Sequence, residues 1–186
     1  GHVDLVLASG SARRRQMLES LGLQPVVAPV EVSERRIQGT VDAQVLHIAK
    51  QKAEAVGDAH DGRVVLVADT MLADPDDATL ALGQPSDAQG ALAMLLRLRG
   101  RRHRVWSASG LRVAGTWAFD LASAVVEFAS FDDDVLADLV HSGSWKGKAG
   151  AYDLAGAMGA HATLVEGDEA TVLGIPGRVL EALTVL

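Results

Sequence analysis

The sequence predicts one α/β domain, in which a mixed parallel and antiparallel sheet carries flanking helices. Early in the chain, apolar runs of strand length alternate with helical patterns, which is typical of parallel strands joined by helices. Residues 102–128 alternate in polarity and contain glycines, which favours antiparallel strands. The length of 186 residues, with 48% hydrophobic residues, fits one domain with a sizeable core.

The first half of the chain predicts three strands and two helices. Strands are expected over residues 3–8, 25–29 and 64–68, and the first and third are apolar enough to be covered on both faces. Helices are expected over 12–21, with Gly22 as its stop, and over 41–56, where apolar residues recur at helical spacing. Residues 3–186 form the predicted domain, and Gly1-His2 are taken as a cloning remnant in place of an initiator Met.

The second half predicts a turn, a helix, two or three antiparallel strands, a short helix, a glycine-rich loop, a strand and a last helix. Ser86 or Asp87 can cap the first of these helices, Asp132 the second, and Pro176 occupies the first position of the last. The corresponding ranges are 74–77, 86–98, 102–128, 132–140, 143–150, 163–165 and the residues from 176 onward.

The composition excludes several classes of protein. There are no cysteines, which rules out disulfides, thiolate nucleophiles and Cys-based zinc sites and favours a cytoplasmic location. No apolar run approaches the roughly 20 residues of a membrane span, and no signal-peptide pattern is present, so no membrane association is expected. A net charge of −7 argues against a stable nucleic-acid partner.

The segment from Ser9 to Arg15 is a candidate phosphate site. A strand leads into Ser9-Gly10-Ser11, and a helix begins at once with three arginines. The first N–H groups of a helix lack partners within it and favour an anion, and arginine offers forked donors to phosphate oxygens. The alternative is a serine helix cap followed by a solvated basic turn. Three cations in a first turn oppose the helix dipole, which favours a nearby anion.

Asp69 directly follows an apolar strand, where ligands of open α/β sheets bind. An ionised carboxylate there could hold a metal or accept a proton. It could equally cap a local turn with Thr70. Other charges, Glu31, Glu34, Lys52, Lys146 and Lys148, would each be solvated alone, but around one cleft they could hold magnesium and a polyphosphate.

Other patterns carry less information. The arginines from Arg97 to Arg104 are interpreted as a solvated helix end, with RNA binding as the alternative. The loop 143–148 has the wrong spacing for a P-loop, and Ala149 replaces the required Ser or Thr. The six histidines show no metal spacing, and none is assigned a catalytic role.

In order along the chain, these segments resemble the Maf family of nucleotide pyrophosphatases. The resemblance rests on motifs in the family's order: Leu7 to Arg14, Glu34, Lys52-Ala53, Ala68-Asp69-Thr70, Ala91 to Gly100 with His103 and Val105, Lys148 to Tyr152, and Gly174-Ile175-Pro176. It implies an elongated, two-lobed fold like that of inosine triphosphate pyrophosphatases, with a central cleft, and a homodimer as a candidate assembly.

The resemblance also implies the roles of individual residues. Asp69 would activate water and, with Glu34, hold a divalent cation, Mg²⁺ or Mn²⁺. The substrate, a nucleoside triphosphate, would be bound by Ser9, Arg13, Arg14, Lys52, Thr70 and Lys148. Water would attack the α-phosphorus and release pyrophosphate, as housecleaning of non-standard or pyrimidine nucleotides.

Three departures from the family pattern leave the base preference open. Gln84 stands where the family usually has lysine, Ala155 where one branch has glutamine, and Ser33 where an acid is common. None of the three is assigned a functional role. The alternative to an enzyme is therefore a nucleotide-binding regulatory protein that has lost turnover.

Overall fold

Seven strands form one mixed sheet in the computed structural model of the chain, which describes residues 3–33 and 37–186. The strands are β1 (Leu5–Leu7), β2 (Val26–Val27), β3 (Val64–Asp74), β4 (Asp77–Leu82), β5 (Arg102–Val113), β6 (Thr116–Phe128) and β7 (Ala162–Glu166). Their order is β2-β1-β3-β5-β6-β7, and β4 pairs with β3 outside this path. β1 runs parallel to β2 and β3, and every other pairing is antiparallel, so the predicted mixed sheet is confirmed.

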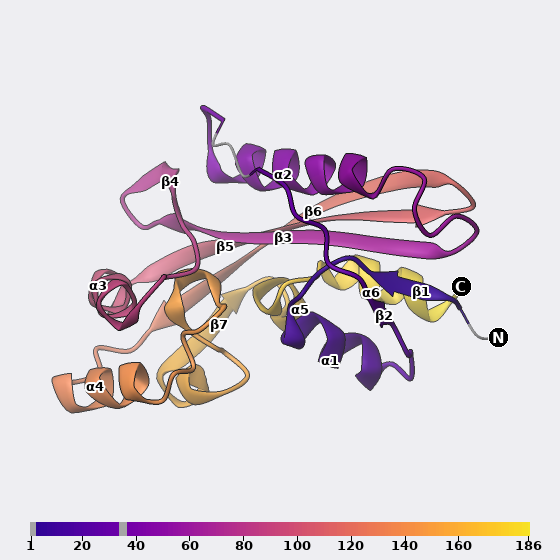
Figure 1. Ribbon diagram of the computed structural model, residues 1–186. Helices are drawn as coiled ribbons and strands as arrows, with labels where there is room; N and C mark the ends of the chain where they lie inside the picture. Colours follow the sequence, from indigo (N-terminus) through magenta and orange to yellow (C-terminus); the bar gives the residue numbers. More distant parts are fainter. Residues whose placement is uncertain (1–2, 34–36) are drawn as a thin grey trace.

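Helices cover both faces of this sheet. The α-helices are α1 (Ala12–Ser20), α2 (Val41–Val56), α3 (Ala88–Leu98), α4 (Asp133–His141), α5 (Glu169–Leu173) and α6 (Gly177–Thr184), and two 3₁₀ turns are η1 (Ala149–Ala151) and η2 (Ala157–His161). α2 packs on one face against β3 and β5, while α5 packs on β5 and β6 from the other face, where α1 and α6 also lie (Figure 1). Among the described residues, no helix combines the length and the apolar character needed to cross a bilayer.

The molecule is elongated, and its long central strands connect two lobes (Figure 1). β1, β2, α1 and α6 lie in one lobe, and α3, α4 and β7 in the other. In the first lobe, side chains of β1 alternate between faces: Leu5 and Leu7 pack with α1 and α6, whereas Val6 packs towards α2. This alternation explains why the first strand reads as continuously apolar, since both of its faces are covered.

Several expected elements are confirmed with their boundaries. α2 spans the predicted residues, Asp87 caps α3 by accepting from the Gly90 amide, and Asp132 caps α4. Residues 102–128 form two strands, not three, joined at Ala114-Gly115. Gly110 does not end a strand but lies inside β5. A Cβ at this position would lie 2.7 Å from the Phe119 ring, so glycine leaves the space that this ring needs.

Other expectations are wrong in their details. The third strand does not end before Asp69, because β3 continues to Asp74 and then turns back into β4, which the sequence did not predict. The short α5 and the turns η1 and η2 were also missed, since segments of three to five residues carry too little periodicity. Pro176 caps α6 and does not occupy its first position.

The arginine cluster from Arg97 to Arg104 lies on the surface as ion pairs, in agreement with the interpretation of a solvated helix end. Each arginine has a carboxylate partner: Arg97 pairs with Asp74, Arg99 with Asp133, Arg101 with Asp76, Arg102 with Glu127, and Arg104 with Glu166. The five arginines are therefore matched by five carboxylates.

A buried aromatic group anchors the loop that follows α4. His103 Nε2 lies 2.8 Å from the Tyr152 hydroxyl, and both rings pack edge-on against Phe128. Just before Tyr152, Gly150 adopts a φ of +73°, and a Cβ at that position would lie 2.3 Å from Leu72 Cδ2. Glycine therefore lets this loop pass close over β3, which brings its residues to the central cleft.

A comparison of two glycines with similar backbone angles tests the close approach at Gly150. Gly62 has a φ of +78° but open space around its Cβ position. We expect Gly62→Ala to lower the free energy of unfolding by about 1 kcal/mol, the cost of a left-handed residue. Gly150→Ala should lose about 1–3 kcal/mol more, because the added methyl overlaps a buried leucine. Urea denaturation measures both, and equal losses would contradict the proposed packing.

The buried His103 predicts a pH dependence of stability. Burial lowers the pKa of His103 from 6.5 to about 4, so the unfolded chain takes up a proton at a higher pH than the folded one. Stability is therefore complete above pH 6.5 and falls as the pH decreases towards 4, by about 3 kcal/mol from this group. Unfolding curves of wild type and His103→Gln should converge over this window; parallel curves would show that His103 is not responsible.

Candidate active site at an open edge of the sheet

The candidate site lies where β3 has a neighbour on only one side. β1 pairs with β3 as far as Leu66, and β4 begins to pair at Leu72. Between them, residues 67–71 of β3 pair in register with β5 alone. Successive side chains of a strand point to opposite faces, and at an open edge both can reach the same space. Asp69 and Thr70 occupy this stretch.

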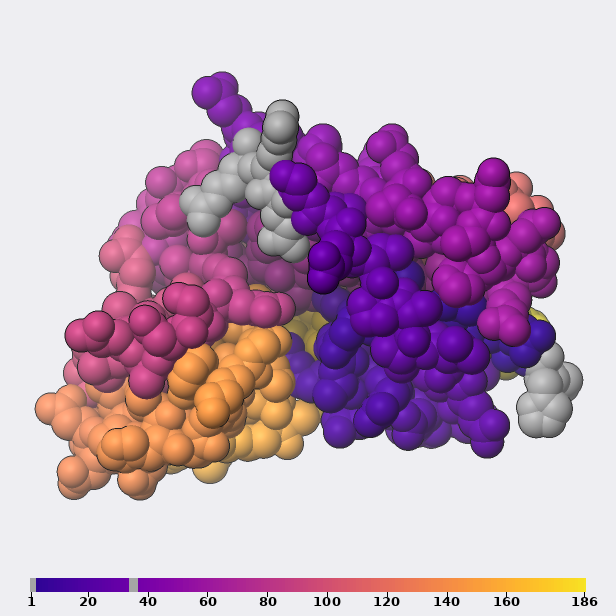
Figure 2. Space-filling model, viewed as in Figure 1, coloured from indigo at the N-terminus to yellow at the C-terminus, as the bar shows by residue number. Residues whose placement is uncertain are grey.

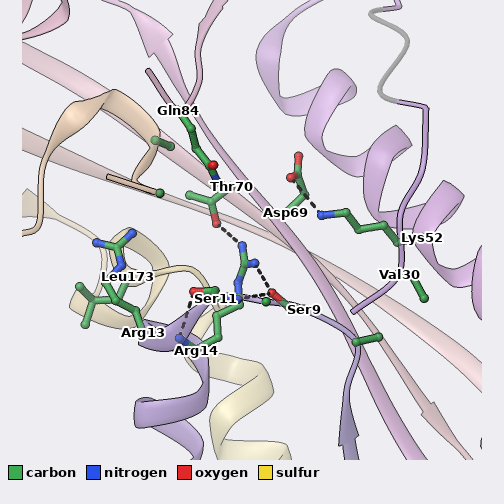
Figure 3. A pocket seen from close by; sticks show the side chains of 14 residues that line it. Ser9, Ser11, Arg13, Arg14, Val30, Lys52, Asp69, Thr70, Gln84 and Leu173 are labelled. Atoms are coloured by element: carbon green, nitrogen blue, oxygen red, sulfur yellow. Dashed lines mark hydrogen bonds and ion pairs between the residues drawn. The ribbon is translucent and has the colours of Figure 1, made fainter. Parts of the chain in front are cut away.

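A pocket of about 330 Å³ opens at this edge (Figure 3). It is lined by Ala8, Ser9, Gly10, Ser11, Arg13, Arg14, Val30, Lys52, Asp69, Thr70, Gln84, Gly147, Ala149 and Leu173. In the space-filling view the surface is hollowed near its centre, between the N-terminal segment in indigo and the orange segment that contains the loop after α4 (Figure 2). The two lobes therefore both contribute residues to the pocket.

The start of α1 forms one wall of the pocket. Ser11 is the N-cap, and its hydroxyl accepts a hydrogen bond from the Arg14 amide at 3.2 Å. The first amides of a helix have no partner within it and carry the positive end of its dipole, so this wall favours an anion. Ser9 and Gly10, which connect β1 to the helix, lie beside these amides in the pocket.

Asp69 and Lys52 meet on the α2 side of β3. The Lys52 ammonium donates to the carbonyl of Ala68 at 2.9 Å and lies 3.4 Å from Asp69 Oδ1 (Figure 3). Only 14% of the Lys52 side chain and 13% of the Asp69 side chain are exposed. An acid and a base are thus held together in a largely enclosed part of the pocket.

Arg14 lies on the other side of β3 and is buried. Its Nε donates to the Gly174 carbonyl at 2.7 Å, Nη1 to Ser9 Oγ at 2.9 Å, and Nη2 to Thr70 Oγ1 at 3.0 Å. Gly174 leaves the space for this group, since a Cβ there would lie 2.9 Å from the arginine Nε. Burial lowers the pKa of Arg14 to about 10, so the guanidinium remains charged at neutral pH.

Arg13 connects the two lobes across the pocket. Its Nη1 lies 3.5 Å from Asp153 Oδ1, and 13% and 24% of the two side chains are exposed. Burial lowers the pKa of Arg13, and the nearby Asp153 carboxylate opposes this effect. The next residue, Arg15, faces solvent and pairs with Glu19 one turn later. The three consecutive arginines therefore have three different environments, and two of them line the pocket.

Most of the predicted site residues are brought together. Ser9, Arg13, Arg14, Lys52, Asp69 and Thr70 all line this pocket. Lys148 does not line it: its neighbours Gly147 and Ala149 do, while its ammonium donates to the Lys146 carbonyl at 3.1 Å. Glu34, the second predicted metal ligand, lies outside the described residues.

Several residues of the site were not assigned by the sequence. Gln84 lines the pocket, Asp153 pairs with Arg13, and Ser107 bonds to Thr70. The departures from the family pattern at Gln84 and after Tyr152 were visible signals. Nothing marked Ser107, one of two serines in a strand whose neighbours are known only once β5 pairs with β3.

Comparisons with known proteins identify the relatives of this chain. A family model described as Maf-like protein matches residues 4–184. A dTTP/UTP pyrophosphatase of Roseobacter denitrificans is 36% identical over 174 residues, which cover 92% of this chain and 90% of the relative. A dTTP/UTP pyrophosphatase of Nitratidesulfovibrio vulgaris is 37% identical over 185 residues, or 96% of this chain and 85% of the relative.

Among solved structures, the Staphylococcus aureus Ham1 protein matches with a TM-score of 0.49 and 15% identity, over 68% of this chain and 72% of that chain. The fold class of this chain follows from its own mixed sheet of parallel and antiparallel strands. The family model and the relatives both extend over nearly the whole sequence. The chain belongs to the Maf-like protein family.

Proposed function

We propose that this protein hydrolyses nucleoside triphosphates to nucleoside monophosphate and pyrophosphate. The observation that carries the proposal is the union, in one pocket, of an anion-binding helix terminus with Lys52 and Asp69. The first two features suit a polyphosphate, and the carboxylate suits the activation of water. Relatives that resemble this chain over most of its length are named dTTP/UTP pyrophosphatases, which supports the same reaction.

The polyphosphate would lie along the start of α1. The helix amides, the Ser9 hydroxyl, Arg13 and Lys52 face it, and Lys148 could turn into the pocket from the adjacent loop. Pyrimidine triphosphates are the leading substrates, because the relatives act on dTTP and UTP by name. Gln84 lines the pocket at a position where the family usually has lysine, so this neutral side chain could alter the base preference.

We propose a divalent cation, Mg²⁺ or Mn²⁺, as the cofactor, because the Asp69 carboxylate lines the pocket. Within residues 3–33 and 37–186, no group of three or more acidic or histidine side chains could enclose a metal. Magnesium in phosphate-binding enzymes needs only one or two carboxylates, and substrate oxygens and water complete its shell. Asp69 would supply one carboxylate and Glu34 the second. When bound, the cation would neutralise charge on the phosphates.

The reaction then uses groups of this chain in simple roles. Asp69 accepts a proton from a water molecule, and the water oxygen bonds to the α-phosphorus. The bond from that phosphorus to the bridging oxygen breaks, and pyrophosphate leaves with the electron pair. Lys52, 3.4 Å from Asp69 Oδ1, lies where its charge can stabilise the phosphoryl oxygens during this step. We place the enzyme in the cytoplasm, as a housecleaning activity, with a homodimer as the candidate assembly.

Replacing the proposed base tests the reaction directly. We expect Asp69→Asn to reduce turnover about 10²- to 10⁴-fold, because the amide cannot accept the proton from water. Pyrophosphate release from a panel of nucleoside triphosphates, with Mg²⁺, Mn²⁺ or EDTA, measures activity and base preference together. If wild-type protein binds nucleotides tightly and leaves all of them intact, the protein is a nucleotide-binding regulator instead.

Two lysines on α2 provide a matched comparison for phosphate binding. Lys52 lines the pocket, whereas Lys50 is exposed and lies over the Phe119 ring. Lys52→Met should lower kcat/KM about 10- to 100-fold, because a charge-assisted contact to the substrate is lost. Lys50→Met removes the same charge two residues away and should leave kinetics unchanged. Similar losses in both variants would mean that general charge, and not the pocket, binds the substrate.

A further inference from the structure

A chain of buried and partly buried hydrogen bonds runs beneath the pocket from α1 to α5. Arg14 donates to Ser9 and to Thr70, and Thr70 bonds to Ser107 at 2.8 Å. The Ser107 hydroxyl in turn donates to the carbonyl of Thr171 at 2.7 Å. Each group in this chain has a limited number of hydrogens and lone pairs, so the bonds determine the direction of one another.

The direction of the bond between Thr70 and Ser107 follows from the far end of the chain. A carbonyl oxygen can only accept, so Ser107 must give its one hydroxyl hydrogen to Thr171. Thr70 is therefore the donor in its bond to Ser107. Both residues are held in place by the antiparallel ladder, in which Thr70 of β3 stands opposite Ser107 of β5.

Arg14 limits the hydrogen bonds that the Thr70 hydroxyl can still form. A guanidinium has only donors, so Thr70 Oγ1 accepts from it. The hydroxyl hydrogen of Thr70 is already given to Ser107, and one lone pair is taken by Arg14. What is left is a single lone pair on a residue that lines the pocket. Thr70 can accept one further hydrogen bond there, but it cannot donate one.

Ser9 has the opposite character. Its oxygen accepts from Arg14 Nη1 at 2.9 Å and from the Ser11 amide at 3.3 Å, which occupies both lone pairs. Its hydroxyl hydrogen remains available, and Ser9 lies beside the start of α1, where the pocket favours anions. One buried arginine thus leaves one pocket hydroxyl as a donor and another as an acceptor.

We propose that Arg14 and Ser107 are positioning residues that make Ser9 a donor to the phosphates and Thr70 an acceptor for a substrate N–H or O–H group or for the attacking water. This inference rests on the proposed function and deepens it. Phosphate oxygens at neutral pH offer acceptors and almost no donors, so Thr70 cannot serve the polyphosphate. It contacts either the nucleoside or the water, and both of these carry hydrogens to donate.

Four variants test this assignment. Thr70→Val removes the acceptor, and Thr70→Ser keeps it. Ser107→Ala removes the acceptor of the Thr70 hydroxyl hydrogen. This hydrogen can then point into the pocket, where it would repel a donor group of the substrate or the water. Ser109→Ala is the matched control, since Ser109 lies two residues along the same face of β5, is equally buried, and has a hydroxyl with no hydrogen-bond partner among the described residues.

We expect Thr70→Val and Ser107→Ala each to lower kcat/KM roughly three- to tenfold, the usual effect of one hydrogen bond. Thr70→Ser keeps the hydroxyl and should retain more activity than Thr70→Val, and Ser109→Ala should behave as wild type. The double variant Thr70→Val/Ser107→Ala should match Thr70→Val alone, because Ser107 acts only through Thr70. If KM rises by an amount that depends on the base, the donor to Thr70 is the nucleoside. If kcat falls equally for all bases, the donor is the attacking water.

The assignment is overturned if Ser107→Ala is as active as Ser109→Ala, if losses of the double variant simply add, or if Thr70→Val retains full activity. These outcomes differ from failure of the proposed function, in which wild-type protein releases no pyrophosphate from any nucleotide. In that case, calorimetric affinities for a triphosphate with a non-hydrolysable α–β bridge, measured over the same variants, test the direction of the Thr70 hydroxyl without turnover.

Discussion

The interrupted edge of β3 is the constraint on which the site depends. β1 approaches this strand from one end and β4 from the other, and they leave residues 67–71 without a neighbour on that side. A central strand in a closed sheet sends alternate side chains into separate layers, where they cannot meet. At this edge, Asp69 on the α2 side and Thr70 on the α1 side line one pocket. Neighbouring residues on opposite faces can therefore take part in one reaction.

The same interruption determines where charge accumulates. The start of α1 follows β1 after a short connection, so its first turn borders the space that β1 leaves beside β3. Lys52 reaches the open stretch from α2 and uses the unpaired Ala68 carbonyl as one of its acceptors. A backbone group that a neighbouring strand would otherwise bind thus anchors a cation next to Asp69. Positive groups gather around a small volume in a protein whose net charge is −7.

The cost of burying the Arg14 charge is offset by hydrogen bonds from its guanidinium. Desolvation lowers its pKa, yet three neutral oxygens accept from its Nε and both terminal nitrogens. The Asp69 charge also acts on this guanidinium and opposes the lowering of its pKa, whereas the neutral acceptors do not cancel its field towards the pocket. Gly174 provides the necessary space at the other end of the sequence. The helix α1 and the segment before α6 are in this way tied to the same strand.

From periodicity and local motifs, the sequence predicted the helix α2, the parallel start of the sheet and the cap at Asp132, and it left Ser86 or Asp87 as the cap of α3. The resemblance to the family predicted that Ser9, Arg13, Lys52 and Asp69 share one site. These features depend on neighbours in sequence or on motif order, which a single chain displays. Tertiary structure alone decided that Asp69 lies within a long strand, that Arg14 is buried among neutral acceptors, and that Ser107 reaches Thr70. Those three depend on which strands pair and where pairing stops, because hydrogen bonds between distant segments follow the register of the sheet and not the spacing of residues along the chain.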